Sequence, residues 1–413
     1  MKLQKTLFSK FRQTKPISLP GEKWGLVLAG GGTRGAYEAG VWKAILDLKI
    51  DIQGFAGTSI GAINSAMILQ DDFDRFYELW TTISFNDILP EIEDIDTHKD
   101  IFSPQNLFAL AAEYLKEGGL DSSMLRGSLM SFVDVEKVYH SPKDLGIVTF
   151  DMASMKPTVI FKDEIGKEKL VDYLCASANF PIFKTKKLDG KKFIDGGVYD
   201  NMPINMLVER GYDHLILVDI NAIGAYKSIE HPENVYTKVI RASADLGGIF
   251  DFNKQRIRDN IVMGYLDTMK AFHRLVGNEY FFRLSAFNEL MMNFDLETIR
   301  GLEIAAKAYK MDRLKIYKAS DFLKELYAKH IEAKAKLNEI QKNGIFNIEL
   351  SDIKKEFEEG TLIPYLQQQL REQPKTYIEP MINKIFPQST DAAAAMLELE
   401  DYMSVLNLST GRK

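Results

Sequence analysis

Three short stretches of the chain combine the residue types that acyl-transfer chemistry requires. Ser59 lies within Gly57-Thr-Ser-Ile-Gly61, a pattern typical of a sharp strand-to-helix turn that exposes a serine hydroxyl. The glycine-rich run 30–35 offers backbone N–H groups that can hold an oxyanion, and Asp195 begins an Asp-Gly-Gly turn, where it can act as a base. Because a nucleophile, a base and an oxyanion hole are the minimum parts for acyl transfer, the stretches together predict a serine hydrolase.

The turn around Ser59 requires a strand before it and a helix after it. Residues 52–57 form a short strand-like run, and apolar residues recur at helical spacing from Ala62 to Leu69. Gly57 and Gly61 have a mechanical role in such an elbow, since side chains at these positions would collide across the turn. The alternative is an ordinary strand-to-helix turn that contains a glycine-flanked serine.

The glycine-rich run follows an apolar strand-like segment, 24–28, and precedes a helical pattern, 37–48. A glycine-rich turn at a helix N-terminus binds anions through its N–H groups and the helix dipole. The run also matches G-x-G-x-x-G, and Asp51 lies 16 residues beyond Gly35, so a dinucleotide site stays an alternative. We favour an oxyanion hole because the next strand leads directly into the serine turn. A phosphate-binding P-loop is excluded, since no Lys-Ser/Thr follows the last glycine. The candidate oxyanion-hole positions are Gly30, Gly31, Gly32, Arg34 and Gly35.

Arg34 has two interpretations within this run. Its guanidinium can steer an anionic lipid headgroup, or it can pair with a carboxylate and brace the glycine turn. We favour bracing, the structural role.

The base is the third part of the set, and a serine hydroxyl usually gives its proton to a histidine. None of the six histidines lies in a glycine-rich or turn-rich setting. Asp195 is better placed, at the end of a strand-like run and before Gly196 and Gly197, although Asp-Gly-Gly is also a common loop signal. A triad with histidine stays open, as do two other acids: Asp219, at a strand end, and Asp200, which we expect to face solvent.

Together these motifs resemble the patatin-like phospholipases, which include bacterial serine lipid acyl hydrolases. The resemblance rests on Gly-Gly-Gly-x-Arg-Gly, then Gly-x-Ser-x-Gly, then Asp-Gly-Gly followed by Asn201 and Pro203. The stretch 175–181, Cys-Ala-Ser-Ala-Asn-Phe-Pro, looks like that family's small-residue helix end before a proline. The resemblance covers about residues 24–219. One departure is Ala29, where many members carry Asp, Ser or Gly.

The resemblance implies a specific fold and mechanism. The fold is α/β, a layered and mostly parallel sheet flanked by helices. The mechanism uses a Ser-Asp dyad without histidine, with Ser59 as nucleophile and Asp195 as base, and the N–H groups around Gly31 and Gly32 form the oxyanion hole. The implied substrate is a fatty-acyl ester of a lipid or at a membrane surface, with phospholipids as the leading candidates. The implied mechanism needs no cofactor. An acyltransferase, a thioesterase or a non-catalytic membrane-associated scaffold stays an alternative.

Composition sets the outer limits. The chain has 413 residues, of which 46% are hydrophobic, enough for one large core and an appended region. A net charge of −6 argues against nucleic acid as a partner. The single cysteine, Cys175, excludes an intramolecular disulfide and fits a reducing compartment, so we expect a cytoplasmic protein, with or without peripheral association with a membrane. No histidine–cysteine cluster has metal-ligand spacing, and we expect no metal.

The chain divides into three parts by pattern. Residues 1–22 are basic, with no apolar run of the length that a signal peptide or a membrane span needs, and we expect a tail or a weak surface-seeking helix. Alternating strand-like and helix-like segments place the catalytic domain at 23–222, with 85–145 as an insertion that covers the site as a lid. Helical periodicity predicts a mostly helical region at 223–413.

Aromatic residues are frequent in the region after residue 222. We expect them to form ordinary helix core rather than a lipid-facing groove, which is the alternative. These residues are Phe250, Phe252, Phe272, Phe281, Phe282 and Phe287.

Overall fold

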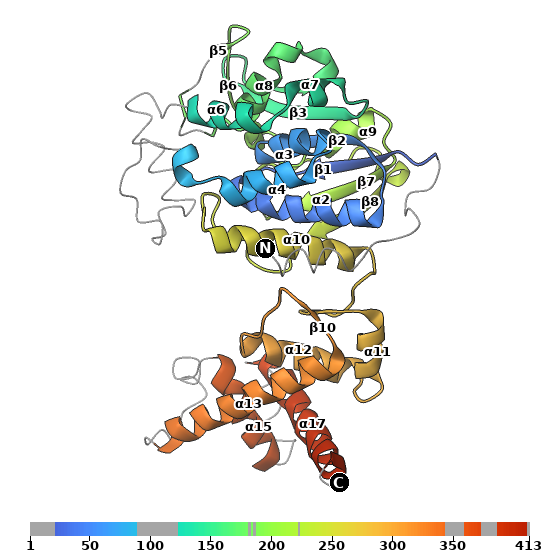
Figure 1. Cartoon of the computed structure of the whole chain (residues 1–413), viewed down its shortest axis with the longest axis vertical. Helices are drawn as coiled ribbons and strands as arrows, with labels where there is room; N and C mark the ends of the chain where they lie inside the picture. Colours follow the sequence, from blue (N-terminus) through green and yellow to red (C-terminus); the bar gives the residue numbers. More distant parts are fainter. Residues whose placement is uncertain are drawn as a thin grey trace. The chain divides into compact units, whose positions relative to one another are not determined.

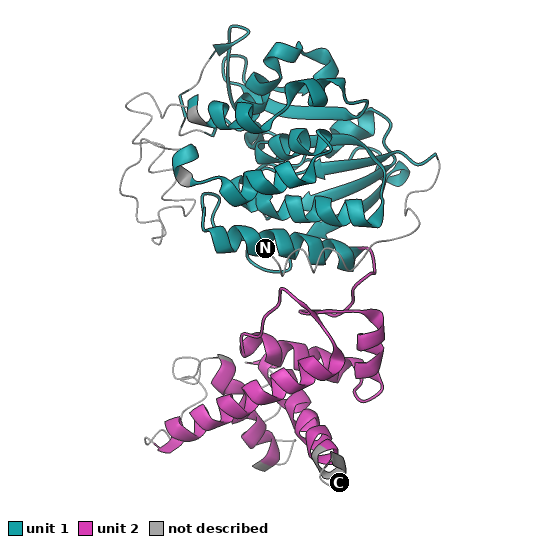
Figure 2. Cartoon of the chain, viewed as in Figure 1, with its two compact units in different colours: residues 1–271 teal, residues 272–413 magenta. Residues whose placement is uncertain are grey.

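The computed structural model describes residues 21–88, 123–180, 183–184, 187–221, 224–342, 359–372 and 386–410. The chain forms two compact units, residues 1–271 and residues 272–413 (Figures 1 and 2). The basic segment 1–20 and the helical pattern expected at 107–115 lie outside the described residues.

A mostly parallel sheet forms the centre of unit 1, as the sequence predicts. Five strands are parallel, in the order β3-β2-β1-β7-β8, and three more, β4, β5 and β6, add antiparallel pairs. Every residue of β1 is buried, as expected for a parallel strand covered on both faces. The strands are β1 Trp24–Leu28, β2 Ile52–Thr58, β3 Asp144–Asp151, β4 Lys156–Phe161, β5 Lys187–Leu188, β6 Lys191–Asp195, β7 His214–Asp219 and β8 Tyr236–Arg241.

Helices cover both faces of this sheet (Figure 1). The pleat turns Gly54 of β2 toward Tyr212, near α9, whereas Gly57, three residues on, faces the first turn of α3. The helices of unit 1 are α2 Ala36–Leu48, α3 Ile60–Leu69, α4 Phe73–Thr82, α6 Ser123–Phe132, α7 Val135–His140, α8 Leu170–Ser177, α9 Ile204–Glu209 and α10 Lys254–Ala271, with short 3₁₀ turns that include η2 Gly32–Gly35 and η7 Gly196–Val198.

One feature of the strand pairing brings the ends of β2 and β6 together. Thr58, the last residue of β2, pairs with Val148 of β3, and Asp195, the last residue of β6, pairs with the next residue, Thr149. Because β4 occupies the other edge of β3 over this stretch, β2 and β6 share one edge and run toward each other. The C-terminal ends of the two strands therefore meet, which places Ser59, the residue after Thr58, beside Asp195.

Unit 1 extends beyond residue 222, the boundary that the change of sequence pattern suggested. The strand β8 continues the parallel sheet beside β7, and α10 packs against α2. The two helices approach closely at two glycines, since a Cβ atom at Gly40 would lie 1.8 Å from the carbonyl oxygen of Ile261, and one at Gly264 would lie 2.0 Å from that of Tyr37. Residues up to 271 therefore belong to the same compact unit as the sheet.

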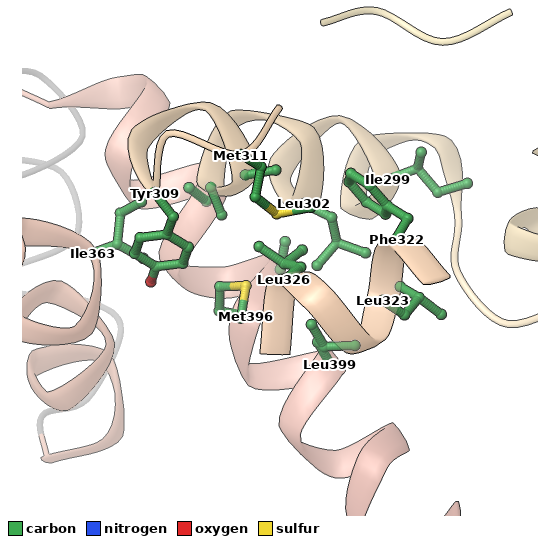
Figure 3. Close-up of a cluster of buried hydrophobic side chains, with 14 of the residues drawn as sticks. Ile299, Leu302, Tyr309, Met311, Phe322, Leu323, Leu326, Ile363, Met396 and Leu399 are labelled. Carbon is green, nitrogen blue, oxygen red and sulfur yellow. The ribbon is translucent and has the colours of Figure 1, made fainter. Parts of the chain in front are cut away.

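Unit 2 is mostly helical, as predicted, with one pair of two-residue parallel strands, β9 Phe281–Phe282 and β10 Ile316–Tyr317. Figure 3 shows Leu302, Leu326 and Met396 pointing toward one another in its core. They come from three helices, which bury a common apolar face. The helices are α11 Leu284–Met291, α12 Leu296–Ala308, α13 Ala319–Lys342, α15 Glu359–Glu372 and α17 Pro387–Thr410.

Truncation of Leu302 tests this core. Leu302 is 0% exposed, so Leu302→Ala is expected to lower the free energy of unfolding of unit 2 by about 2–5 kcal/mol, through lost burial and the cavity left behind. Leu296→Ala, at the start of the same helix and 61% exposed, is the matched control and should cost less than about 0.5 kcal/mol.

Urea unfolding followed by two probes gives the measurement. Circular dichroism reports both units, whereas tryptophan fluorescence reports unit 1, because all three tryptophans, Trp24, Trp42 and Trp80, lie there. The Leu302 variant should shift the circular dichroism transition and leave the fluorescence transition unchanged. Equal, small shifts for both leucine variants would contradict the described core.

Candidate active site

Ser59 and Asp195 line the same cavity, which has a volume of about 350 Å³. Its wall also includes residues of the glycine-rich turn. The rest of the wall is mainly apolar, and the side chains that form it include Ile60, Ile63, Trp80, Ile83, Ile88, Leu125, Phe180, Phe183, Val198, Ile249, Phe250 and Phe252. A concave, largely apolar site with a few convergent polar groups is the usual form of a small-molecule binding site.

Ser59 stands at a strained turn between β2 and α3. Its φ of 54° and ψ of −125° lie outside the conformations that non-glycine residues ordinarily adopt. The turn is also tight, since a Cβ atom at Gly57 would lie 2.3 Å from the carbonyl carbon of Gly61. The contact at Gly61 differs from the expected one across the turn, because a Cβ atom there would lie 2.2 Å from the carbonyl oxygen of Leu28 in β1. Both flanking glycines are therefore required by close backbone contact.

Asp195 ends β6 and is 8% exposed. Burial raises the pKa of its carboxyl to about 6, while hydrogen bonds from the Ser59 side chain and from the N–H of Gly197 act in the opposite direction. The N–H of Gly197 donates to Oδ1 at 2.8 Å. Gly196 lies over the end of β3, where a Cβ atom would be 2.3 Å from the carbonyl oxygen of Val148. The turn thus presents a buried carboxyl, with a pKa suited to a base near neutral pH, to the serine hydroxyl.

The glycine-rich turn offers two backbone N–H groups to the cavity. Within the described part of the chain, the N–H groups of Gly31 and Gly32 make no hydrogen bond, and both residues line the cavity. The N–H of Gly30 instead donates to the carbonyl of Asn201 at 3.2 Å, and that of Arg34 to the carbonyl of Gly31. Gly35 lies outside the cavity wall, where a Cβ atom would meet the side chain of Ile60 at 2.7 Å.

Arg34 braces the turn through backbone carbonyls rather than through a carboxylate. Its Nε donates to the carbonyl of Gly247 at 2.7 Å, and its Nη1 donates to the carbonyl of Asn221. The neighbouring Thr33 reinforces this contact, because its N–H donates to Ile249 and its hydroxyl to Gly248. The turn is therefore fixed to the segment 247–249, which also forms part of the cavity wall.

The alternative bases lie elsewhere or have other partners. No histidine is among the described residues that line the cavity, and His98 lies outside the described residues. Asp219 forms an ion pair with Arg241 at 2.9 Å. Asp200 does not face solvent as expected: it is 5% exposed, accepts the N–H of Met202 at 3.2 Å, and has a pKa that burial raises to about 6. It is buried because the chain turns inward again after the Asp-Gly-Gly turn.

Three polar residues that support the site were not assigned a role from the sequence. The Ser177 hydroxyl accepts the N–H of Ser59 at 2.9 Å, and the Asn201 side chain donates to the carbonyl of Gly30 at 3.2 Å. The hydroxyl of Thr58 donates to the carbonyl of Asp200 at 2.7 Å, which links the serine elbow to the aspartate turn. Ser177 and Asn201 both belong to the motifs quoted above, and this was the signal available for them.

Substitution of Gly32 tests the glycine-rich turn. Its φ is 57°, and a Cβ atom would lie 2.0 Å from the carbonyl oxygen of Ile249, so Gly32→Ala must displace the turn. We expect ester turnover to fall about 10²-fold, as for loss of an oxyanion donor, and the thermal unfolding midpoint to fall as well. Gly127→Ala, within α6 and with open space around its Cβ position, is the matched control and should leave turnover unchanged without lowering the unfolding midpoint. Parental turnover in the Gly32 variant would contradict an oxyanion role.

The described residues hold neither a metal-binding cluster nor a membrane-spanning helix. No group of three or more His, Cys, Asp or Glu side chains there is arranged to hold a metal ion. Among the helices of the described ranges, none combines the length and the hydropathy that crossing a bilayer requires.

Comparison with known proteins gives the family. The profile of the patatin-like phospholipase family matches residues 26–208, which include all three motifs. An uncharacterized NTE family protein of Mycobacterium tuberculosis is 23% identical over 202 residues, covering 49% of this chain and 31% of the relative. Triacylglycerol lipase 4 of Saccharomyces cerevisiae is 24% identical over 221 residues, covering 48% of this chain and 24% of the lipase.

The matched stretch thus spans less than a third of each of these relatives. Among solved structures, VipD from Legionella pneumophila matches with 12% identity and a TM-score of 0.39, over 92% of this chain and 90% of that one. Residues 26–208 of this chain belong to the patatin-like phospholipase family.

Proposed function

We propose that the chain is a serine lipid acyl hydrolase that cleaves fatty-acyl esters through a Ser59–Asp195 dyad. Phospholipids are the proposed substrates. The observation that carries the proposal is the meeting of these two residues in one apolar cavity, with the serine on a strained elbow and the aspartate hydrogen-bonded to it. The family match of residues 26–208 supports a lipid hydrolase.

The proposed reaction has two stages. Asp195 takes the proton of the Ser59 hydroxyl as Oγ attacks the ester carbonyl carbon, and the N–H groups of Gly31 and Gly32 stabilise the negative oxygen. Collapse breaks the ester bond, and the leaving alkoxide takes the proton back from Asp195. Asp195 then deprotonates a water molecule, which attacks the carbonyl carbon of acyl-Ser59. Collapse of this second intermediate breaks the bond to Oγ and releases the fatty acid, and the Ser59 oxygen takes the proton back from Asp195.

The cavity wall supports a fatty-acyl substrate. Two of the aromatic residues expected to form helix core, Phe250 and Phe252, instead line the cavity, whereas Phe281 and Phe282 are buried in unit 2. The segment 85–145, proposed as a lid, contributes Ile88 and Leu125 from its described parts. An acyl chain in this cavity exchanges water for apolar contacts, at about 0.8 kcal/mol for each buried CH₂ group. Access to lipid from a membrane surface fits a peripheral association.

The alternatives are a different acyl-transfer enzyme with the same dyad and a non-catalytic scaffold. In an acyltransferase or thioesterase, the acyl-Ser59 intermediate forms from a different donor or is resolved by a different acceptor. In a scaffold, the fold is kept without turnover. The presence of both Ser59 and Asp195 at the cavity favours catalysis over a scaffold.

Release of fatty acid from phosphatidylcholine and phosphatidylglycerol vesicles tests the proposal. The parent protein should release fatty acid, and Ser59→Ala should not. Transfer of the acyl group to an added alcohol, with little free fatty acid, would indicate an acyltransferase. Absence of both products from a folded parent would contradict catalysis on lipid esters.

A further inference from the structure

Ser177, the last residue of α8, contacts the backbone of the nucleophile. Its side chain is 0% exposed, and its Oγ accepts the N–H of Ser59 at 2.9 Å. The same hydroxyl donates to the carbonyl oxygen of Val148 at 2.7 Å. Because β2 ends at Thr58, the sheet supplies no acceptor for the Ser59 N–H, and the Ser177 hydroxyl takes that place.

This contact acts on the strained residue of the site. A backbone conformation such as that of Ser59 costs on the order of 1–3 kcal/mol and persists only where its surroundings hold it. The bond to Ser177 fixes the peptide plane between Thr58 and Ser59, and this plane sets the direction in which the Ser59 side chain leaves the backbone. Loss of the bond leaves a backbone donor without its acceptor and allows the elbow to relax.

Asn179, two residues after Ser177, also contacts the base. The carbonyl of Asn179 accepts the N–H of Asp195 at 2.9 Å, and its side-chain amide donates to the carbonyl of Phe193 at 2.8 Å. Ser177 and Asn179 therefore accept the backbone N–H groups of Ser59 and Asp195, the two members of the dyad.

The end of α8 is itself fixed to β3, at the point where β2 and β6 meet. Ser177 bonds to Val148, and the hydroxyl of Thr149 donates to the carbonyl of Ala176 at 3.1 Å. Val148 and Thr149 are the residues that pair with Thr58 and Asp195. The sheet, the helix end and the dyad thus form one connected network of hydrogen bonds.

We propose that Ser177 is a positioning residue for the nucleophile: by holding the N–H of Ser59, it orients the serine hydroxyl toward Asp195 and the cavity. Ser177 is not part of the cavity wall, so its effect on the reaction passes through Ser59. The inference rests on the proposed function, since it assigns the geometry of that same site to one further residue.

A matched control separates this role from simple packing. Ser65 is also 0% exposed, and its hydroxyl donates to the carbonyl of Gly61 within α3 at 2.7 Å rather than to the backbone of Ser59 or Asp195. Ser65→Ala and Ser177→Ala therefore remove the same atom from equally buried sites. Only Ser177→Ala removes the acceptor of the nucleophile's N–H.

The experiment measures the rate constant for labelling of Ser59 by a fluorophosphonate, together with thermal unfolding and the kinetics of a soluble aryl ester. Ser177→Ala is expected to label about 10- to 100-fold more slowly than the parent, with kcat reduced, KM unchanged and an unfolding midpoint close to that of Ser65→Ala. Labelling of Ser177→Ala at the parental rate would overturn the inference, as would an equal loss in Ser65→Ala.

A second variant keeps the test decisive if Ser177→Ala fails to fold. Ser177→Cys keeps the shape of the side chain but replaces the hydroxyl with a weak acceptor, so its labelling rate should lie clearly below that of the parent. A parental rate in folded Ser177→Cys would then overturn the inference. Absence of labelling in the folded parent would instead remove the proposed function, and the positioning role with it.

Discussion

Replacement of Ser59 by alanine is expected to lower ester turnover by on the order of 10⁴-fold or more, with the fold retained. The variant lacks the oxygen that forms the acyl-enzyme. Steady-state hydrolysis of a soluble aryl ester by the parent and the variant measures the effect. Circular dichroism and thermal unfolding of both proteins provide the control for folding.

Ser59→Gly adds a structural test of the same residue. Glycine adopts positive φ values without a steric penalty, so this variant relieves the strain at the elbow. We expect it to be as inactive as Ser59→Ala and to unfold at a higher temperature. Substantial turnover in both variants would contradict the assignment of the nucleophile.

The second large effect is expected for Asp195→Asn, which should lower kcat by about 10²- to 10⁴-fold. Asparagine keeps the shape of the side chain and an acceptor for the N–H of Gly197, but it cannot accept the serine proton. The measurement is again ester turnover, alongside thermal unfolding. If a histidine were the base, Asp195→Asn would keep substantial activity and one of the six histidine-to-alanine variants would lose it.

The pKa of Asp195 gives this variant a pH signature. Since burial raises the pKa to about 6, the carboxyl is protonated below that value and cannot act as a base. In the parent, kcat/KM should therefore fall as the pH is lowered through about 6, and the residual activity of Asp195→Asn should lack this step. A parental profile flat from pH 5 to pH 8 would contradict a base with this pKa.

The contribution of Asp195 to the free energy of unfolding should fall as the pH rises, whereas kcat/KM rises over the same range. The folded protein binds the Asp195 proton more tightly than the unfolded chain does, so this residue lowers stability as the pH rises from about 4 through about 6. Asp195→Asn removes that contribution and should unfold at or above the parental temperature at pH 8. Asp200, with a similarly raised pKa, keeps its own contribution in both proteins.

The sequence was sufficient to predict the sheet and the motifs, because both leave local patterns. The strand-like runs 24–28 and 52–57 and the helical spacing after Ser59 correspond to β1, β2 and α3. The close contact at Gly57 also has a local signal, since it occurs across one turn, to Gly61, whereas the contact at Gly61 is with Leu28 of β1 and has none.

The close approach of the ends of β2 and β6 could not be predicted from local patterns. It depends on β2 and β6 sharing one edge of β3, a pairing between residues more than 40 positions apart, with no local signature. The burial of Asp200 and the roles of Ser177 and Asn201 follow from the same long-range arrangement. Likewise, the helical pattern after residue 222 did not reveal that α10 packs on α2, since periodicity shows that a face is buried but not against what.

The most direct test of the central claim is to treat the folded parent with a fluorophosphonate and locate the adduct by peptide mass spectrometry. We expect a single adduct, on Ser59, which is absent from Ser59→Ala and formed more slowly in Asp195→Asn. An adduct on a different residue would contradict Ser59 as the nucleophile. So would the absence of any adduct from the folded parent, both in solution and in the presence of phospholipid vesicles.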